Sequence, residues 1–406
     1  MFNSVLFLIS PSGNLVYTLG STETFVPGIT VNRIPNPNLK WEETDQTDAG
    51  IDLFFKNRVS LTFDWYKRKN KDLLVYVPLP TSNGIGGTGY VGSDIATNAA
   101  TAENTGVEVT IGYAYRASQD FNINVNGNVA YNKNKVLSLG KQFLAPIRSG
   151  SFFTLPAFTY TSAGIPIGSF YGYRVDHVAK DQAEIDALNA LAAQKTGTPN
   201  AKYQAGLVPG DFIFKDLNGD GQVNDKDQEV LGNPMPKFLY GFNAFLSYKN
   251  FDLNIVISGV TGLKLINATR FYTYYADKPH NSTTAVLDRW RKPGDVAPLP
   301  RAGQNANSNL RPSDFFLEDG SFLRLRNITL GYTIPTSALN SITRNVVSNL
   351  RIYIAAENLF TMTKYKGYDP EISTQGASGN YIFQRGIDDV QLPQPRSFLF
   401  GIQFGF

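Results

Sequence analysis

Apolar and polar residues alternate with a period of two along several long stretches of the chain. The first stretch covers residues 49–55, breaks at Lys56-Asn57-Arg58 and resumes over residues 59–65. A period of two places successive side chains on opposite faces of an extended strand. Two such runs joined by a short polar segment predict a β-hairpin with long arms.

The same alternation predicts further hairpins over residues 107–115 with 121–131 and over 238–248 with 251–257. Single strands are predicted at 322–332, 350–358 and 398–406. The strand at 121–131 carries asparagine at every second position from 122 to 128. Amides need hydrogen-bond partners, which a dry core rarely supplies, so this face is predicted to be wet.

The strand at 322–332 has an irregular phase. Leu323 and Leu325 are out of step with Ile328, Leu330 and Tyr332. We expect the first two to point opposite to the other three, with a β-bulge between the two sets.

The connections between strands alternate between short and long. The long ones are residues 77–101, 137–235, 263–320 and 361–395, and short helices are expected within them at 181–194 and 284–291. All short turns then lie at one end of the sheet. Transmembrane β-barrels combine short turns, long outer loops and alternating apolar and polar faces. A soluble β-sandwich also alternates, but long loops confined to one end are unusual for it. The pattern therefore predicts an all-β antiparallel meander that belongs to a transmembrane β-barrel.

Composition narrows the classes of function. The chain has 406 residues, 17% charged, a net charge of +3 and no cysteine. The small net charge disfavours nucleic acid as a partner. The lack of cysteine excludes disulfides and thiolate metal sites. Residues 1–45 are expected to be irregular, with a strand remnant near Val5 to Ile9, a run that lacks the basic flank and cleavage site of a signal peptide.

One segment has the spacing of an EF-hand-like calcium loop. Oxygen-bearing side chains stand at loop positions one, three, five and twelve, glycine at six, and a backbone carbonyl is available at seven; the predicted ligands are Asp216, Asn218, Asp220, Gln222 and Asp227. We expect structural Ca²⁺ within an insertion at 210–235. An alternative is a turn of Asp, Asn and Gly stabilised by its own side chains.

Other candidate sites have less support. The two histidines, His177 and His280, have no partner at metal-binding spacing, and no catalytic or phosphate-binding motif is present. We predict no enzyme activity and no organic cofactor, and interpret Asp388-Asp389 as exposed loop acids.

Two sets of side chains have open interpretations. One set, Phe271, Tyr272, Tyr274 and Tyr275, is suited either to contact with a sugar or partner or to loop packing. Arg324 and Arg326 either line a lumen or are solvated at a strand end.

Several motifs resemble those of SusC/RagA-like TonB-dependent outer-membrane transporters. They are Asn36-Pro37-Asn38-Leu39-Lys40-Trp41-Glu42, the block from Gly210 to Gly221 with Gly232-Asn233-Pro234, the strand Phe322 to Tyr332, Ala356-Glu357-Asn358-Leu359-Phe360, and the aromatic final strand. The resemblance covers residues 30–406 in the order of that family.

The resemblance implies a function and a set of partners. It implies that residues 46–406 are the C-terminal part of a barrel of about 22 strands, contributing about nine or ten. Members carry a plug and a TonB-contacting segment before the barrel, so Met1 is expected to be an internal or truncated start, and this part alone an open, curled sheet. The implied activity is TonB-dependent import of oligosaccharides or peptides across the outer membrane with a SusD-like surface lipoprotein. The alternative is a soluble or cell-surface all-β carbohydrate-binding or adhesin module without transport.

The final strand has two interpretations. It ends on an alternating apolar series, Phe398, Phe400, Ile402, Phe404 and Phe406. As plain structure it closes a sheet. By resemblance it is the C-terminal signal that the outer-membrane insertion machinery recognises.

Overall fold

The computed structural model describes residues 36–78, 94–118, 120–140, 146–151, 155–274, 281–302, 309–343, 346–372 and 381–405, and the backbone of 9–19 and 24–31. Its main feature is a nine-stranded antiparallel sheet in the order β20-β18-β17-β14-β13-β6-β5-β4-β3. The strands are β3 (Glu43–Phe55), β4 (Val59–Pro78), β5 (Asp94–Arg116), β6 (Phe121–Ser138), β13 (Phe238–Tyr248), β14 (Phe251–Thr261), β17 (Phe322–Thr333), β18 (Asn349–Thr363) and β20 (Ser397–Gly405).

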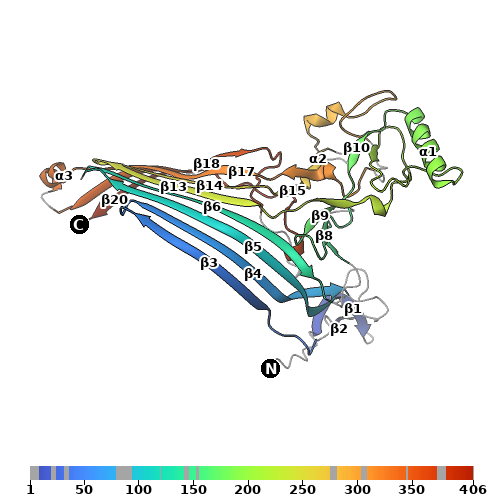
Figure 1. The fold of residues 1–406 in the computed structure, drawn as a ribbon, viewed down its shortest axis with the longest axis horizontal. Helices are drawn as coiled ribbons and strands as arrows, with labels where there is room; N and C mark the ends of the chain where they lie inside the picture. The colour runs from blue at the N-terminus through green and yellow to red at the C-terminus, as the bar shows by residue number, and fades with distance from the viewer. Residues whose placement is uncertain are drawn as a thin grey trace.

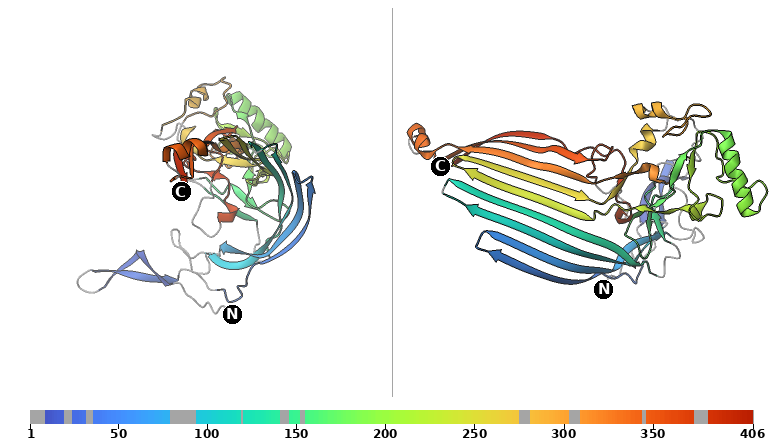
Figure 2. Two further views of the ribbon diagram at one scale, coloured as in Figure 1. Left: turned by 90° about the vertical axis from the view of Figure 1, so that its left-hand side faces the viewer. Right: turned by 45° about the horizontal axis from the view of Figure 1, so that its top comes forward.

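The sheet is a curled meander that does not close (Figures 1 and 2). The short connections lie at one end, with helix α3 (Thr336–Thr343), and the long connections gather at the other. Lys56 and Asn57 in the first turn have φ of 48° and 50°, a left-handed conformation that Asn adopts more readily than most residues. None of the described helices is long and apolar enough to cross a bilayer. The predicted open sheet of short turns and long loops is confirmed.

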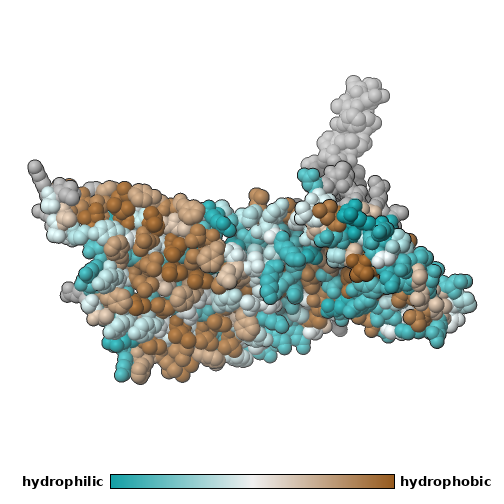
Figure 3. All heavy atoms as spheres, turned by 90° about the horizontal axis from the view of Figure 1, so that it is seen from above, coloured by the Kyte–Doolittle hydropathy of each residue, from teal (hydrophilic) through white to brown (hydrophobic). Residues whose placement is uncertain are grey.

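The two faces of the sheet differ in polarity. Cross-strand register aligns Leu53, Leu61, Ile111 and Phe242 in one row, and Ile111 remains 53% exposed. Apolar surface spreads over the strands, whereas the loop end is mostly polar (Figure 3). Large exposed apolar surface marks contact with another apolar phase. The alternate asparagines of β6 lie on the opposite, polar face, as predicted.

Strand β17 contains the expected bulge, but its effect differs from our prediction. The register with β14 and β18 shifts between Leu325 and Asn327. The extra residue, Arg326, restores the phase, so that Leu325 pairs with Ile257 and Ile328 with Ile255. Leu323 and Leu325 therefore share a face with Ile328, because a bulge inserts one residue without moving the strand to the other face.

Several predicted loops contain more strand than expected. β4 and β5 have 20 and 23 residues and remain paired up to Pro78 and Asp94, inside the predicted loop 77–101. Ladder hydrogen bonds come from the backbone, so pairing continues through the Thr, Asn and Ala residues of this segment. Residues 1–45 are not wholly irregular, since β1 (Ile9–Leu19) pairs with β2 (Thr24–Val31) and β3 begins at Glu43. Residues 1–8, and with them most of the predicted strand remnant, lie outside the described residues.

The long connections fold into small sheets and helices beside the loop end of the main sheet (Figure 1). The predicted helix at 181–194 is α1 (Gln182–Thr196), capped by Asp181, and the one at 284–291 is a shorter 3₁₀ turn, Thr284–Asp288. The remaining elements are β7 (Ile147–Ser149), β8 (Thr159–Thr161), β9 (Ser169–Gly172), β10 (Val175–Val178), β11 (Phe212–Phe214), β12 (Glu229–Gly232), β15 (Lys264–Asn267), α2 (Thr269–Thr273), β16 (Leu317–Asp319), β19 (Ile387–Asp388) and 3₁₀ turns at Asp225–Asp227, Asp314–Phe316 and Tyr381–Phe383.

Candidate functional site

The described parts of the long connections, here called the loop module (residues 146–235, 263–320 and 364–395), contain most of the buried apolar clusters of the molecule. Phe158 and Phe316 are fully buried and meet edge to face at 5.6 Å. Tyr173 joins two separate connections, because its N–H donates to the carbonyl of Pro312 and its carbonyl accepts from Asp314. The loop module is therefore a built surface at one end of the sheet.

Asp211, which the sequence did not single out, holds two connections together. Its carboxylate is 1% exposed and accepts at 2.9 Å from both Arg301 Nε and Asn309 Nδ2. Burial raises the pKa of Asp211, while Arg301 and Asn309 oppose that rise. Gly210 has φ of 88°, and a Cβ there would lie 2.4 Å from the Trp290 ring. A Gly-Asp pair directly before the apolar run Phe212–Phe214 is the sequence signal for this role.

The predicted calcium ligands lie together in one compact loop. Asp216 accepts through Oδ1 from the N–H of Gly219 at 2.7 Å and through Oδ2 from the N–H of Gly221 at 2.8 Å. Asn218 Nδ2 donates to Asp220 Oδ2 at 3.1 Å. The backbone N–H of Gln222 and the amide of Asn218 lower the pKa of Asp220. The five predicted residues therefore form one turn rich in oxygen atoms.

Asp227 organises this loop from its interior. It is fully buried and accepts from the N–H groups of Leu217 at 2.9 Å and Asn224 at 2.8 Å. Lys195 Nζ lies 3.7 Å from Asp216 Oδ2. Among the described residues, no three His, Cys, Asp or Glu side chains are grouped closely enough to hold a metal by themselves. Asn218 and the backbone carbonyl of Gln222 would have to complete a cation site. Each carboxylate has about four lone-pair sites, so accepting N–H bonds leaves capacity for a cation.

The predicted aromatic contact residues lie in and around α2. Phe271 is 4% exposed and packs within the loop module. Tyr272 is half-buried, packs against Phe271 at 5.8 Å and reaches Asp389 at 3.4 Å. Tyr274 packs on Arg270, whose guanidinium lies 5.1 Å from its ring centre. These contacts are those of loop packing. Tyr275 lies outside the described residues.

Arg324 and Arg326 attach the loop module to the polar face of the sheet. Arg324 is 2% exposed and donates to Asp369 at 2.5 Å and Glu371 at 2.9 Å. Arg326 forms two parallel bonds of 2.7 Å to Glu371. The bulge makes this possible, because it adds Arg326 to the face that carries Arg324. Both arginines lie on the polar face, but Arg324 is covered by its partners, so it is neither solvated at a strand end nor open to a lumen.

The histidines and loop acids form no catalytic group in the described residues. His177 binds Asp176 at 2.9 Å and Glu184 at 2.8 Å. Burial lowers the pKa of His177, but these carboxylates raise it further, so the net direction is upward. His280 lies outside the described residues. The interpretation of Asp388 as exposed is wrong: it is fully buried and accepts from the Tyr365 hydroxyl at 2.6 Å, because the chain folds back to form β19 there.

The final strand lies at an edge of the main sheet. β20 pairs with β18, with Phe400 opposite Ile354 and Ile402 opposite Ile352. Phe398 and Phe400 are 76% and 69% exposed. Phe404 is also exposed, and Phe406 lies outside the described residues. The aromatic side of β20 therefore continues the apolar face.

A curled β-meander with one apolar face, one polar face and a folded loop module defines part of an outer-membrane β-barrel. The chain belongs to the TonB-dependent receptor β-barrel family, since the profile "TonB dependent receptor-like, beta-barrel" matches residues 9–359. TonB-dependent receptor P3 of Formosa agariphila is 31% identical over 385 residues, which are 94% of this chain and 36% of that protein. TonB-dependent receptor SusC of Bacteroides thetaiotaomicron is 27% identical, over 98% of this chain and 34% of that protein.

Solved structures agree with this assignment. The RagAB peptide importer in its closed-closed state matches with a TM-score of 0.71 and 25% identity, over 97% of this chain and 38% of that chain. The RagAB peptide transporter matches with the same values. The chain thus spans between a third and two fifths of the length of these relatives. The predicted membership in the family and the barrel fold are confirmed.

Proposed function

We propose that the chain forms the wall, lumen face and outer loops of a TonB-dependent importer of oligosaccharides or peptides in the outer membrane of a Gram-negative cell. The observation that carries this proposal is the opposed polarity of the two sheet faces. Exposed Ile, Leu and Phe rows suit lipid, while Asn, Asp and Arg on the other face suit a water-filled lumen. Membership in the receptor family supports the same function.

The loop module is the proposed contact surface for a SusD-like lipoprotein and for the transported ligand. It lies at the end of the sheet opposite the short turns, which face the periplasm in outer-membrane barrels. Arg324, Arg326, Asp369 and Glu371 hold part of this module against the polar face. Energy coupling through TonB would come from segments that the relatives contain and this chain does not cover.

We also propose that the loop from Asp216 to Asp227 takes Ca²⁺ as a structural ion. The support is its spacing and the gathering of carboxylate and amide oxygens in one turn. Bound Ca²⁺ would hold the loop rigid at the outer surface and would take no part in chemistry.

Fractionation and uptake of the full-length protein that carries this chain test the main proposal. We expect the protein in the outer membrane, with a gel mobility that changes on heating, and energy-dependent uptake of maltooligosaccharides or of peptides from a casein digest. An uncoupler of the proton gradient should abolish the uptake. Recovery in the aqueous fraction together with glycan binding would instead support the soluble or surface carbohydrate-binding module.

A further inference from the structure

Two rows of aromatic side chains bracket the apolar face. At the turn end, register aligns Phe121, Tyr248, Phe251 and Tyr332. At the loop end, Tyr131 pairs with Phe238, and their rings are 5.3 Å apart. Ten residue steps on β6 separate the rows, or about 33 Å of strand. A strand tilt of about 40° leaves about 25 Å along the membrane normal, which is the height of the apolar band in outer-membrane barrels. The rows therefore mark the two membrane interfaces.

Lysines lie directly beyond the aromatic row at the loop end. Cross-strand pairing through β5 places Tyr131 of β6 in the same row as Trp65 of β4. Two residues further along the same face lie Lys67 and Lys133, and two residues beyond these lie Lys69 and Lys135. The side chains of Lys133 and Lys135 are exposed. Register thus places lysines of β4 and β6 at the level where lipid headgroups lie, with Thr105 and Glu103 of β5 between them.

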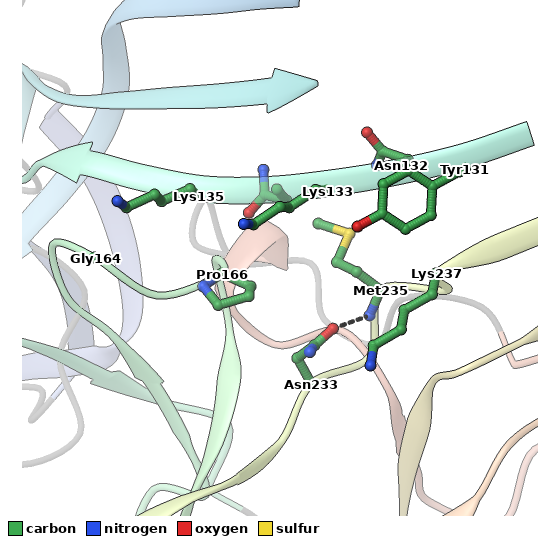
Figure 4. A pocket seen from close by; sticks show the side chains of 10 residues that line it. Tyr131, Asn132, Lys133, Lys135, Gly164, Pro166, Asn233, Met235 and Lys237 are labelled. Atoms are coloured by element: carbon green, nitrogen blue, oxygen red, sulfur yellow. Dashed lines mark hydrogen bonds between the residues drawn. The ribbon is translucent and has the colours of Figure 1, made fainter. Parts of the chain in front are cut away.

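A cavity of about 370 Å³ opens beside these lysines (Figure 4). It forms because β13 begins only at Phe238, whereas β6 continues to Ser138. On the side of β6 that faces β13, the last hydrogen bond between the two strands runs from the N–H of Asn132 to the carbonyl of Lys237. The next hydrogen bond on that side of β6 runs from the N–H of Val136 to the carbonyl of Ile165. Because N–H groups of alternate residues point the same way, Asn134 directs its N–H into this gap. The cavity is thus lined by this one backbone N–H and by three lysines, Lys133, Lys135 and Lys237.

The cavity has a positive charge that the described residues do not neutralise. No Asp or Glu is among its lining residues, which are Tyr131, Asn132, Lys133, Asn134, Lys135, Gly164, Pro166, Asn233, Met235 and Lys237. Glu103 is opposite Lys135 in the register, but its carboxylate lies 3.1 Å from Lys67. Within the described chain, none of the three cavity lysines forms an ion pair. An anion is therefore the complementary ligand.

We propose that Lys133, Lys135 and Lys237 bind the phosphate of an anionic lipid at the loop-end interface of the membrane. In this arrangement the acyl chains of the lipid lie against Tyr131 and Phe238, and the headgroup of the lipid lies in the cavity. Lysine ammonium groups bind phosphate as point charges, and those near a membrane surface attract anionic lipid. The proposal rests on the membrane placement proposed above but is independent of the transported substrate.

Lipid binding by the full-length protein in detergent tests this proposal. Native mass spectrometry would measure bound phosphatidate in mixed micelles with phosphatidylcholine. We expect binding of phosphatidate over phosphatidylcholine, and about tenfold or greater loss of that binding in Lys133→Gln/Lys135→Gln/Lys237→Gln. The matched control is Lys56→Gln/Lys249→Gln, which removes exposed lysines from the turn end and should leave binding unchanged. Lys133→Arg/Lys135→Arg should also retain it, because charge is kept.

Three results would overturn the lipid site. They are equal binding of phosphatidylcholine, equal loss in the turn-end control, and displacement of phosphatidate by an equal concentration of inorganic phosphate, which would indicate a soluble anion instead. A heat-dependent gel shift shows that each variant forms the barrel; if the triple variant does not, Lys133→Gln/Lys135→Gln provides the same comparison. A folded barrel without phosphatidate binding would reject this site while leaving the proposed importer intact.

Discussion

At the scale of single residues, one buried charged group, Arg324, lies where the loop module meets the sheet. Arg324 is almost fully buried, and a buried arginine is tolerated only with close anionic partners. Asp369 is 6% exposed, whereas the side chain of Glu371 is 37% exposed. Water can therefore partly replace Glu371 as a partner of the arginines, but it cannot replace Asp369.

This difference predicts an order of effects. Asp369→Asn should lower the free energy of unfolding by about 3 kcal/mol, because it leaves Arg324 poorly neutralised. Glu371→Gln should cost about 1–2 kcal/mol, since water reaches that site. Urea unfolding of the full-length protein in detergent, with proteolysis of residues 364–372 as a second readout, measures both.

A matched control removes an exposed carboxylate. Asp45 pairs with Lys71 at 2.5 Å and is 61% exposed, so Asp45→Asn should change stability little. The predicted importance of the buried network would be contradicted if Asp369→Asn had no larger effect than Asp45→Asn.

The proposed calcium binding also depends on single residues. Calorimetric titration of the full-length protein should show binding with a dissociation constant of about 0.1–1 mM, as in extracellular calcium modules. Asp216→Ala/Asp220→Ala should abolish the heat, whereas Asp186→Ala, an exposed acid on α1, should not. Absence of heat in the unaltered protein would favour the loop stabilised by its own side chains.

At the scale of elements, strand β20 is notable for its exposed aromatic side. Its even-numbered residues from Phe398 to Phe404 face away from the polar side of the sheet, and the strand pairs only with β18 among the described residues. This geometry suits both a closing strand and a segment presented to the insertion machinery. The two roles predict different effects on membrane insertion when the last residue is deleted.

Deletion of Phe406 distinguishes these roles. If the strand is an insertion signal, the deletion should leave severalfold less heat-shifted barrel in the outer membrane, measured on gels of membrane fractions. Gln403→Ala, which changes the alternate face of the same strand, should insert normally. Unchanged insertion of the deletion variant would leave β20 with the structural role alone.

At the scale of the whole molecule, the sheet is an open wall with two edges. β3 and β20 each have one neighbour in the described chain, and unpaired backbone groups are costly in hydrocarbon. A membrane-inserted form must therefore pair both edges with further strands. The chain spans about a third of the length of its curated relatives.

The sequence alone determined the local features of this protein. Strands, turns, the wet asparagine face and helix α1 were all predictable, because each depends on residues within a few positions of one another. The EF-hand-like spacing likewise located a compact turn around Asp216. The length of β4 and β5 was missed, because backbone pairing extends beyond the apolar pattern.

Only the tertiary structure decided which distant residues meet. The bulge at Arg326 corrected the predicted orientation of Leu323 and Leu325, since phase depends on how neighbouring strands pair. Burial of Asp211 and Asp388 depends on connections far along the chain. The sequence shows a basic run at residues 67–71 and a separate pair at Lys133 and Lys135. Only register places lysines of β4 and β6 at the same level, because cross-strand neighbours are set by hydrogen-bonded pairing and not by proximity along the chain.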